Sequence, residues 1–241
     1  MKMFVTDYDE TLYLNDVDIK KNIKKLKELQ KNNYIIVIST GRSYPSIKNQ
    51  INNFKIPYDY VSCADGSIVY DNNENIIHLS IMNKEIIPII QNFYKKVNFE
   101  EIQFSYPEGY SNLLTNSDNL LGINICISNE NYHDKLKKDF LKIKNKFPNY
   151  NYLIYTHPHF SYLCVKPVNV SKSYAINFLC NKLEIHKDNI YVIGDSSNDY
   201  EMIRDFNGVG MKNSCKEILD ITNKTYSNVT EYINDILKNE A

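Results

Sequence analysis

The sequence predicts an α/β protein, with a doubly wound, Rossmann-like parallel sheet and an inserted α+β domain. Over residues 1–66, short apolar runs that end in acidic or hydroxyl residues alternate with amphipathic helical segments. The same alternation returns after residue 168, whereas residues 80–167 show an α+β pattern without such strand ends. Alternating strands and helices are typical of parallel sheets. We therefore expect a discontinuous core domain of residues 1–79 and 168–241, and a second domain of residues 80–167.

The first part of the core begins with the apolar run MFVTD at 3–7, which is typical of a buried parallel strand. A helix follows, because Asn15-Asp16 is a good N-cap and apolar residues recur at helical spacing. These apolar residues are Ile19, Ile23, Leu26 and Leu29. The lysine-rich stretch 20–27 is interpreted as the solvated face of this helix. The next expected elements are a strand at 34–40, a helix at 43–54, a third strand at 59–66 and a hairpin at 67–80.

The remaining elements are expected on the same grounds. In the second domain they are a helix at 84–96, strands at 100–106 and 120–128, a helix at 132–147, and strands at 151–156 and 160–167. In the second part of the core they are a helix at 171–183, a strand at 189–195, a helix at 198–206, a short strand at 207–211, and helices at 215–222 and 229–238.

The composition narrows the class of protein. The 241 residues are 43% hydrophobic and 24% charged, with a net charge of -1. This balance of charges gives no general electrostatic attraction for nucleic acid or membrane lipid. No apolar run approaches the roughly 18–20 residues of a membrane helix, and no signal peptide is evident. The five cysteines have no CxxC spacing, which argues against a disulfide framework or a structural zinc site. We expect a cytoplasmic protein, a monomer or small homo-oligomer, with neither a nucleic-acid nor a membrane partner.

Reactive side chains follow the predicted core strands at their carboxyl ends, where open parallel sheets bind ligands. They are Asp7 and Asp9 after the first strand, Thr40, Gly41 and Arg42 after the second, Lys172 at a helix start, and Asp195, Asn198 and Asp199 after the strand at 189–195. Several carboxylates so close together require a cation, and one lysine is insufficient. Oxygen ligands favour Mg²⁺, which together with a lysine would attract a phosphoryl group. An aspartate is a competent nucleophile toward phosphorus.

Four segments in order, DYDET, ISTGR, SK and GDSSND, resemble the signature segments of the haloacid dehalogenase (HAD) superfamily of phosphotransferases. The long interval between Thr40 and Lys172 resembles the large-cap (C2, subclass IIB) members, specifically the Cof-type sugar-phosphate phosphatases. The resemblance implies a HAD core that carries a C2-type cap at 80–167, and a Mg²⁺-dependent phosphoric monoester hydrolase.

The resemblance also implies a role for each matching residue. Asp7 is the nucleophile and a metal ligand, and Asp9 is the general acid/base and binds the metal through its carbonyl. Thr40 and Gly41 bind the phosphoryl group, and Lys172 neutralises the nucleophile and the phosphoryl oxygens. Asp195 is a metal ligand, Asp199 is a ligand or an acceptor for a metal-bound water, and Asn198 contacts phosphate or the metal shell. Lys172 is preferred to Lys166 and Lys182 because it begins a helix within VSKS.

Two residues depart from the family pattern. Glu10 replaces the Gly that most often follows the second aspartate. Asp65 stands where Cof-type proteins usually have Asn before Gly66, and both residues are possible substrate contacts. Arg42 is expected either to contact the substrate or to pair with an acid of the cap.

The sequence His157-Pro158-His159 resembles a metal motif on paper. The proline and the absence of further ligands favour a cap loop, which could still face the cleft.

These features together predict hydrolysis of a small phosphorylated metabolite through a phospho-Asp7 intermediate, with the cap acting as a lid that determines specificity. A phosphosugar mutase of the same superfamily is the nearest alternative. A receiver-like phosphoacceptor module is a second, although Asp9 would hasten loss of its phosphate. A non-catalytic binding protein is a third, although the set of site residues is complete. The sequence does not identify the substrate.

Overall fold

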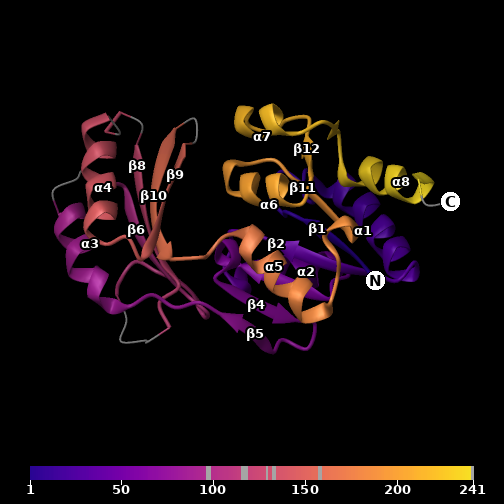
Figure 1. The fold of residues 1–241 in the computed structure, drawn as a ribbon, viewed down its shortest axis with the longest axis horizontal. Coiled ribbons are helices and arrows are strands. Elements are labelled where there is room, and N and C mark those ends of the chain that lie inside the picture. Colours follow the sequence, from indigo (N-terminus) through magenta and orange to yellow (C-terminus); the bar gives the residue numbers. More distant parts are fainter. Residues whose placement is uncertain (96–98, 115–118, 129, 132–133, 157–158, 240–241) are drawn as a thin grey trace. The chain divides into compact units, whose positions relative to one another are not determined.

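The computed structural model separates into two compact units (Figure 1). It describes residues 1–95, 99–114, 119–128, 130–131, 134–156 and 159–239. The first unit consists of Met1–His78 and Ser171–Ala241, and the second of Leu79–Val170. The domain boundaries expected from the sequence, at 79/80 and 167/168, lie close to these divisions.

The first unit contains a mixed, mostly parallel sheet of eight strands in the order β13-β12-β11-β1-β2-β3-β4-β5. The strands are β1 (Lys2–Thr6), β2 (Tyr34–Ser39), β3 (Tyr60–Cys63), β4 (Ile68–Asp71), β5 (Ile76–Leu79), β11 (Ile190–Gly194), β12 (Val209–Met211) and β13 (Thr225–Tyr226). Neighbouring strands from β13 to β3 are parallel, and β4 returns antiparallel to β3. The predicted α/β fold class is therefore confirmed.

Helices cover both faces of this sheet, as the continuous apolar strands predict. They are α1 (Asp16–Lys31), α2 (Tyr44–Phe54), α5 (Lys172–Leu183), α6 (Tyr200–Asp205), α7 (Lys216–Ile221) and α8 (Val229–Asn239). Alternate side chains of β1 point to opposite faces. Met3 and Val5 pack in a cluster with Ile176 of α5 and Ile203 of α6. Phe4 instead contacts the ring of Tyr232 of α8, with 5.8 Å between the ring centroids.

Helix α1 confirms the prediction from its N-cap and apolar spacing. The side chain of Asn15 accepts hydrogen bonds from the backbone N–H groups of Val17 and Asp18, both at 3.0 Å. The four apolar residues predicted to face the core are all buried.

The lysines of the stretch 20–27 are exposed or half-buried, as predicted for the solvated face of the helix, but Asn22 within the stretch is fully buried. Its Nδ2 donates to the carbonyl of Leu12 at 2.9 Å. Its Oδ1 accepts from the backbone N–H and the hydroxyl of Thr230, at 3.0 and 2.9 Å. Asn22 therefore ties the loop that follows β1 to the beginning of α8, a role that periodicity cannot reveal.

The third predicted strand is shorter than expected. Strand β3 ends at Cys63, and Ala64–Gly66 forms a 3₁₀ turn in which Ala64 and Asp65 have φ of 49° and 53°. This left-handed backbone cannot continue a strand. Gly66 has φ of 99°, and a Cβ there would lie 2.2 Å from the carbonyl oxygen of Ser171. Only glycine permits this close approach to the start of α5.

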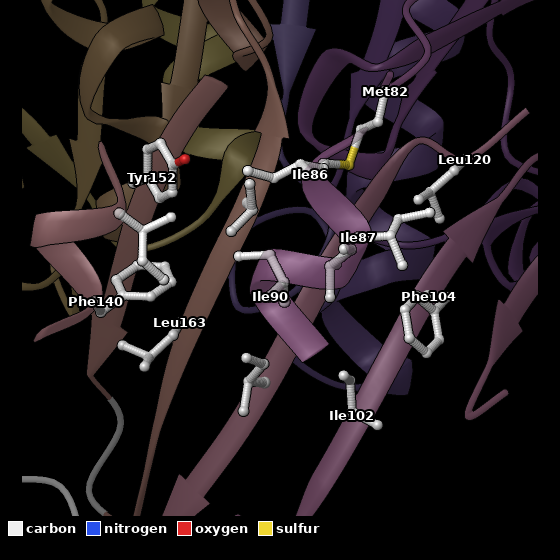
Figure 2. Close-up of a cluster of buried hydrophobic side chains, with 14 of the residues drawn as sticks. Met82, Ile86, Ile87, Ile90, Ile102, Phe104, Leu120, Phe140, Tyr152 and Leu163 are labelled. Carbon is white, nitrogen blue, oxygen red and sulfur yellow. The ribbon is translucent and has the colours of Figure 1, made fainter. Parts of the chain in front are cut away.

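The second unit contains an antiparallel sheet of five strands in the order β7-β6-β8-β10-β9. Its elements are α3 (Ile87–Tyr94), β6 (Glu101–Tyr106), β7 (Gly109–Ser111), β8 (Gly122–Ser128), α4 (Asp134–Lys146), β9 (Tyr150–Thr156) and β10 (Phe160–Pro167). Apolar side chains of α3, α4 and the strands form one buried cluster, which includes Ile90, Phe140 and Leu163 (Figure 2). The unit thus has a core of its own.

Two predicted helices of the second unit differ in their bounds from the prediction. The segment expected at 84–96 is a 3₁₀ turn, Lys84–Ile86, followed by α3. The predicted positions Lys96 and 132–133 lie outside the described residues. Strands β7 and β13 were not predicted, because three and two residues are too short for a periodic pattern. No helix in the described part of the chain is long and apolar enough to span a membrane.

Asn22→Asp should lower the free energy of unfolding by about 2–4 kcal/mol, because the carboxylate cannot donate to Leu12 and places a charge in the core. Urea unfolding followed by circular dichroism measures this change. Asn72→Asp, at an exposed turn, makes the same chemical change and should alter the free energy by about 0.5 kcal/mol or less. Equal effects of the two substitutions would contradict the role assigned to Asn22.

Candidate active site

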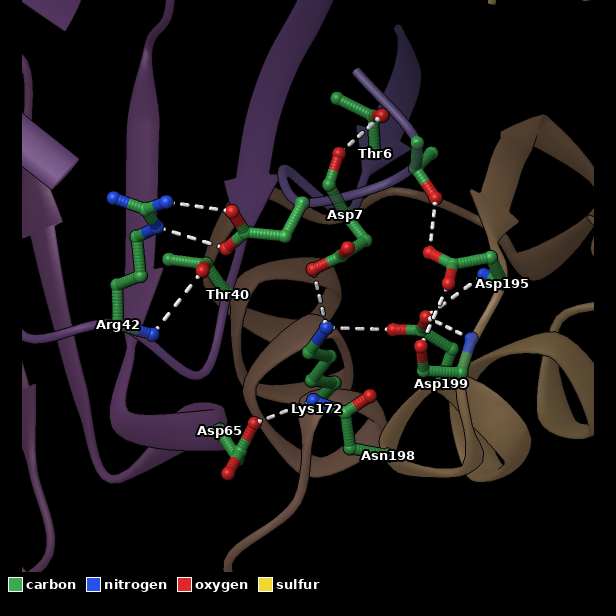
Figure 3. A network of polar contacts seen from close by, with 12 residues as sticks. Thr6, Asp7, Thr40, Arg42, Asp65, Lys172, Asp195, Asn198 and Asp199 are labelled. Carbon is green, nitrogen blue, oxygen red and sulfur yellow. Dashed lines mark hydrogen bonds and ion pairs between the residues drawn. The ribbon is translucent and has the colours of Figure 1, made fainter. Parts of the chain in front are cut away.

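Lys172 is the centre of a polar network in the first unit (Figure 3). Ser171 is the N-cap of α5, and its side chain accepts from the backbone N–H of Tyr174 at 3.2 Å, so that Lys172 is the first helical residue. The Lys172 side chain is fully buried. Its Nζ donates to Oδ1 of Asp7 and to Oδ1 of Asp199, both at 2.6 Å. Of the three lysines considered from the sequence, Lys172 is the one with these contacts, while Lys182 is exposed.

The parallel pairing of β1 with β11 brings the two acidic segments together. Asp7 follows β1, and its backbone N–H donates to the carbonyl of Ile193 in β11 at 3.1 Å. Asp195 follows β11 directly, so both side chains emerge at the same edge of the sheet. A Cβ at Gly194 would lie 2.5 Å from Cγ of Asp199, so glycine at this position lets Asp199 fold back onto the strand end.

Protein donors occupy the carboxylate oxygens of Asp195 and Asp199. Oδ2 of Asp199 accepts from the backbone N–H groups of Asp195 and Ser196, at 2.9 and 3.0 Å. Asp195 accepts from the hydroxyl of Thr11 on Oδ1 and from that of Ser196 on Oδ2, both at 2.6 Å. No role was predicted for Thr11, which lies in the DYDET segment, or for Ser196, which lies in the GDSSND segment. The family motif alone was the signal that could have found them.

Three buried carboxylates offer a site for a hard cation. Asp7, Asp195 and Asp199 each present a ligand oxygen, and these atoms lie within 4.8 Å of one another. Burial raises the pKa of Asp7 well above its usual range; Lys172 opposes this rise, and Asp199 and Asp195 add to it. Burial and Asp199 likewise raise the pKa of Asp195. An oxygen-only set with this excess of negative charge fits a divalent cation of the Mg²⁺ type.

The neighbouring carboxylates also shift the pKa of Lys172. Burial lowers the pKa of its ammonium group, but the attraction of Asp199, Asp7 and Asp65 outweighs burial and leaves the pKa raised. Lys172 is therefore a permanent cation in this site.

Asp9 lies apart from the carboxylate cluster and is paired with Arg42. The guanidinium donates from Nε to Oδ2 at 2.8 Å and from its terminal nitrogen to Oδ1 at 2.6 Å. Arg42 also lies over the ring of Tyr8, 5.1 Å from its centroid. Its backbone N–H donates to Oγ1 of Thr40 at 3.1 Å. Arg42 was expected either to contact the substrate or to pair with an acid of the cap; in the structure it pairs with an acid of its own unit, because Asp9 and Arg42 follow adjacent strands.

Asp65 and Asn198 join the network from two further segments. Nδ2 of Asn198 donates to Oδ1 of Asp65 at 3.0 Å. The backbone N–H of Asp65 donates to the carbonyl of Thr40 at 3.1 Å. Glu10, the other departure from the family pattern, has φ of 56°, a left-handed backbone that favours glycine.

The structure brings the predicted site residues together at one edge of the first unit's sheet. They are Asp7, Asp9, Thr40, Gly41, Arg42, Asp65, Gly66, Lys172, Asp195, Asn198 and Asp199. Of the histidines considered as a metal motif, His157 lies outside the described residues, as does Pro158, and His159 is exposed in the second unit.

The comparison with protein families decides the assignment of the chain. A family model described as haloacid dehalogenase-like hydrolase matches residues 4–121 and 110–235. This chain belongs to the haloacid dehalogenase-like hydrolases. The family predicted from the four sequence segments is therefore confirmed.

Two relatives align with most of the chain. The chain is 25% identical over 245 residues to the 5-amino-6-(5-phospho-D-ribitylamino)uracil phosphatase YcsE of Bacillus subtilis. This alignment covers 96% of this chain and 90% of YcsE. The chain is also 28% identical over 240 residues to an uncharacterized protein of Mycoplasma capricolum. That alignment covers 85% of this chain and 88% of the relative.

Solved structures share the HAD fold of this chain. The phosphatase BT1666 of Bacteroides thetaiotaomicron has a TM-score of 0.79 at 17% identity, covering 99% of this chain and 94% of that one. The HAD subclass IIB sugar phosphatase BT4131 has a TM-score of 0.75 at 17% identity, covering 100% and 99%.

Lys172→Met should lower the free energy of unfolding of the metal-free protein by about 3–5 kcal/mol, because two buried carboxylates lose their cation. Because burial raises the pKa of Asp7, its folded form binds protons more tightly than its unfolded form. Loss of Lys172 removes the group that opposes this rise, so the pKa of Asp7 is higher still in the variant. The deficit should therefore shrink as the pH falls through the further raised pKa of the variant. Urea unfolding at several pH values measures this dependence.

The matched control is Lys182→Met on the exposed side of the same helix, with an expected change of about 0.5 kcal/mol or less at any pH. A deficit in Lys172→Met that stays constant with pH would contradict the charge argument.

Proposed function

We propose that this protein is a Mg²⁺-dependent phosphatase that hydrolyses a small phosphate monoester through a phospho-Asp7 intermediate. The observation that carries the proposal is the contact of Asp7 with the buried ammonium of Lys172, within a cluster that includes Asp195 and Asp199. A carboxylate held beside a permanent cation at the carboxyl end of a parallel sheet is suited to attack phosphorus.

The metal would be held by Asp7, Asp195 and the carbonyl of Asp9. Asp199, whose Oδ1 accepts from Lys172 and whose Oδ2 accepts from two backbone N–H groups, would either add a ligand oxygen or accept from a metal-bound water. A bound Mg²⁺ would neutralise carboxylate charge and stabilise the negative charge of the phosphoryl group.

The chain's own residues would carry out two successive displacements. In the first, an Asp7 oxygen forms a bond to phosphorus, the ester P–O bond breaks, and Asp9 gives its proton to the departing alcohol oxygen. In the second, Asp9 takes a proton from a water that attacks the phosphorus of phospho-Asp7, which releases inorganic phosphate and restores Asp7. Thr40, the Gly41 backbone N–H, Lys172 and Asn198 would hold the phosphoryl oxygens, where positioning and electrostatics supply most of the catalysis.

Arg42 constrains the proton transfer that this mechanism asks of Asp9. Both oxygens of Asp9 accept from the guanidinium, so at least one of these hydrogen bonds must open before Asp9 exchanges a proton with the leaving group or water. An Arg42 released in this way would be available to contact the substrate, which is one of the two roles expected for it from the sequence.

The second unit, Leu79–Val170, is proposed to be the C2-type cap that selects the leaving group, and the first unit the catalytic core. The relative YcsE is named for a phosphate ester of a ribityl chain, and BT4131 is named a sugar phosphatase. These names support a small hydroxyl-bearing phosphate ester as the substrate class. We continue to expect a cytoplasmic monomer or small homo-oligomer.

Mg²⁺ should raise the midpoint of thermal unfolding, because it binds the folded state alone. At a free Mg²⁺ concentration 100 times the Kd, the free energy of unfolding rises by about 2.7 kcal/mol. For a chain of this size this raises the midpoint by roughly 5–10 °C. Asp195→Asn should abolish most of this shift by removing a charged ligand. Asp188→Asn, whose parent side chain is 86% exposed, should retain it. A shift of the same size in Asp195→Asn would exclude this metal site.

Asp7→Asn should reduce turnover to background with Mg²⁺ present, while the thermal midpoint shows that the protein remains folded. Asp9→Asn should slow turnover by about 10²–10⁴-fold. Release of inorganic phosphate, measured against isomerised phosphate ester, separates the phosphatase from a phosphosugar mutase. Substantial turnover by Asp7→Asn would contradict nucleophilic catalysis, and a long-lived phosphoprotein in the wild type would favour a receiver-like module.

A further inference from the structure

The second unit contains a cavity of about 300 Å³ that the proposed mechanism does not use. Its lining residues come from three stretches of the chain: 81–85, 146–150 at the end of α4 and the beginning of β9, and 167–168 at the end of β10. All of them lie within Leu79–Val170, so the cavity is separate from the carboxylate cluster of the first unit. Small-molecule sites have volumes of about 300 Å³ and above, so the occupant of this cavity must be small.

The walls of the cavity are largely apolar, although water reaches them. Ile81 and Val168 are 48% and 51% exposed, in contrast to the buried core of the same unit. Exposed apolar side chains that gather around a hollow are typical of a ligand site, whereas single ones scattered over a surface are not. The apolar lining residues are Ile81, Phe147, Pro148, Tyr150, Pro167 and Val168.

Contacts between the three stretches fix the shape of the cavity. The hydroxyl of Tyr150 donates to the carbonyl of Asn83 at 3.1 Å. The hydroxyl of Tyr152 donates to the carbonyl of Phe147 at 3.2 Å. Pro167 is paired in register with Tyr150, so β10 holds the third stretch beside β9. The walls are therefore arranged before a ligand binds, which lowers the entropic cost of binding.

Two side chains of opposite charge line the same cavity. Lys146 is the last residue of α4, and Glu85 lies in the 3₁₀ turn Lys84–Ile86. Within the part of the chain that the structure describes, neither side chain is engaged in a hydrogen bond or an ion pair. Burial and the charge of Glu85 raise the pKa of Tyr150, so Glu85 lies near that wall. The Tyr150 hydroxyl donates its one hydrogen to Asn83, and its oxygen can still accept from a ligand.

We infer that this cavity binds a small zwitterion with an apolar body, namely an α-amino acid with an apolar side chain. Its carboxylate would pair with Lys146, and its ammonium group would donate to Glu85 and to the oxygen of Tyr150. Its side chain would lie against Ile81 and Val168. A simple anion or cation would leave one of the two charged side chains without a partner, and a ligand without an apolar body would leave the walls in contact with water.

The experiment titrates the full-length ¹⁵N-labelled protein with four probes and follows its backbone amides by NMR. L-leucine carries all three recognised groups, 4-methylpentanoate lacks the ammonium group, 3-methylbutylamine lacks the carboxylate, and glycine lacks the side chain. The reporting amides are those of Glu85, Phe147 and Tyr150, which belong to lining residues. The titration requires no turnover, so its outcome is independent of the proposed phosphatase function.

The variants are Lys146→Met and Glu85→Gln, each with a matched control at an exposed position of the same unit. Lys137→Met removes a lysine nine residues earlier in α4, which at about 3.6 residues per turn lies on the opposite side of the helix. Glu108→Gln removes a glutamate between β6 and β7. Neither control residue lines the cavity.

In the wild type, L-leucine should give saturable shifts of the reporting amides, and each of the other probes should bind about fivefold more weakly or worse. Lys146→Met should remove the preference for L-leucine over 3-methylbutylamine, and Glu85→Gln should remove the preference over 4-methylpentanoate. Both controls should keep these preferences. No saturable shift with L-leucine would overturn the inference, as would equal binding of 4-methylpentanoate, or an unchanged preference in Lys146→Met.

Discussion

The site depends on one buried ammonium group that two carboxylates share. Lys172 is fully buried, and an unpaired charge in that position would be very costly. Its hydrogen bonds to Asp7 and Asp199 offset this cost, but Asp195 remains close by and leaves the cluster with excess negative charge. Burial raises the pKa of Asp7 in the metal-free protein, and Asp199 and Asp195 add to this rise against the opposing effect of Lys172. The excess of negative charge also favours the binding of a divalent cation and of a phosphoryl group beside it.

The fold supplies the contacts that keep these carboxylates in place. Parallel pairing of β1 with β11 puts two strand ends side by side, and a helix start brings the lysine to them. Hydroxyl groups of Thr11 and Ser196 satisfy Asp195, and two backbone N–H groups satisfy one oxygen of Asp199. Gly194 leaves room for Asp199 to reach them. Acidic side chains that are held by so many protein donors are preorganised before any ligand binds.

Glu10 and Asp65, two of the residues around the site with a left-handed backbone, depart from the family pattern. Glu10 has φ of 56° and lacks the freedom of glycine, which costs roughly 1–2 kcal/mol. Its backbone N–H donates to Tyr13, whose own N–H donates to Tyr8, so the surrounding loop holds this conformation. Asp65 tolerates its left-handed backbone more readily and adds a charge instead. Backbone strain of this kind is concentrated at functional sites in proteins.

The sequence alone determined the order of most strands and helices, the family, and the side chains that gather at one sheet edge. Apolar periodicity, helix caps and strand-end residues are local signals, whereas strands as short as β7 and β13 have no such signal. It did not determine which side chains become partners. Asn22 follows the pattern of a solvated helix yet is buried, and Thr11 meets Asp195 across 184 positions of the chain. The pairing of Asn198 with Asp65 spans 133 positions. Such contacts depend on how strands and helices pack. Packing brings together residues that are far apart in the sequence, and no local pattern indicates that they are partners.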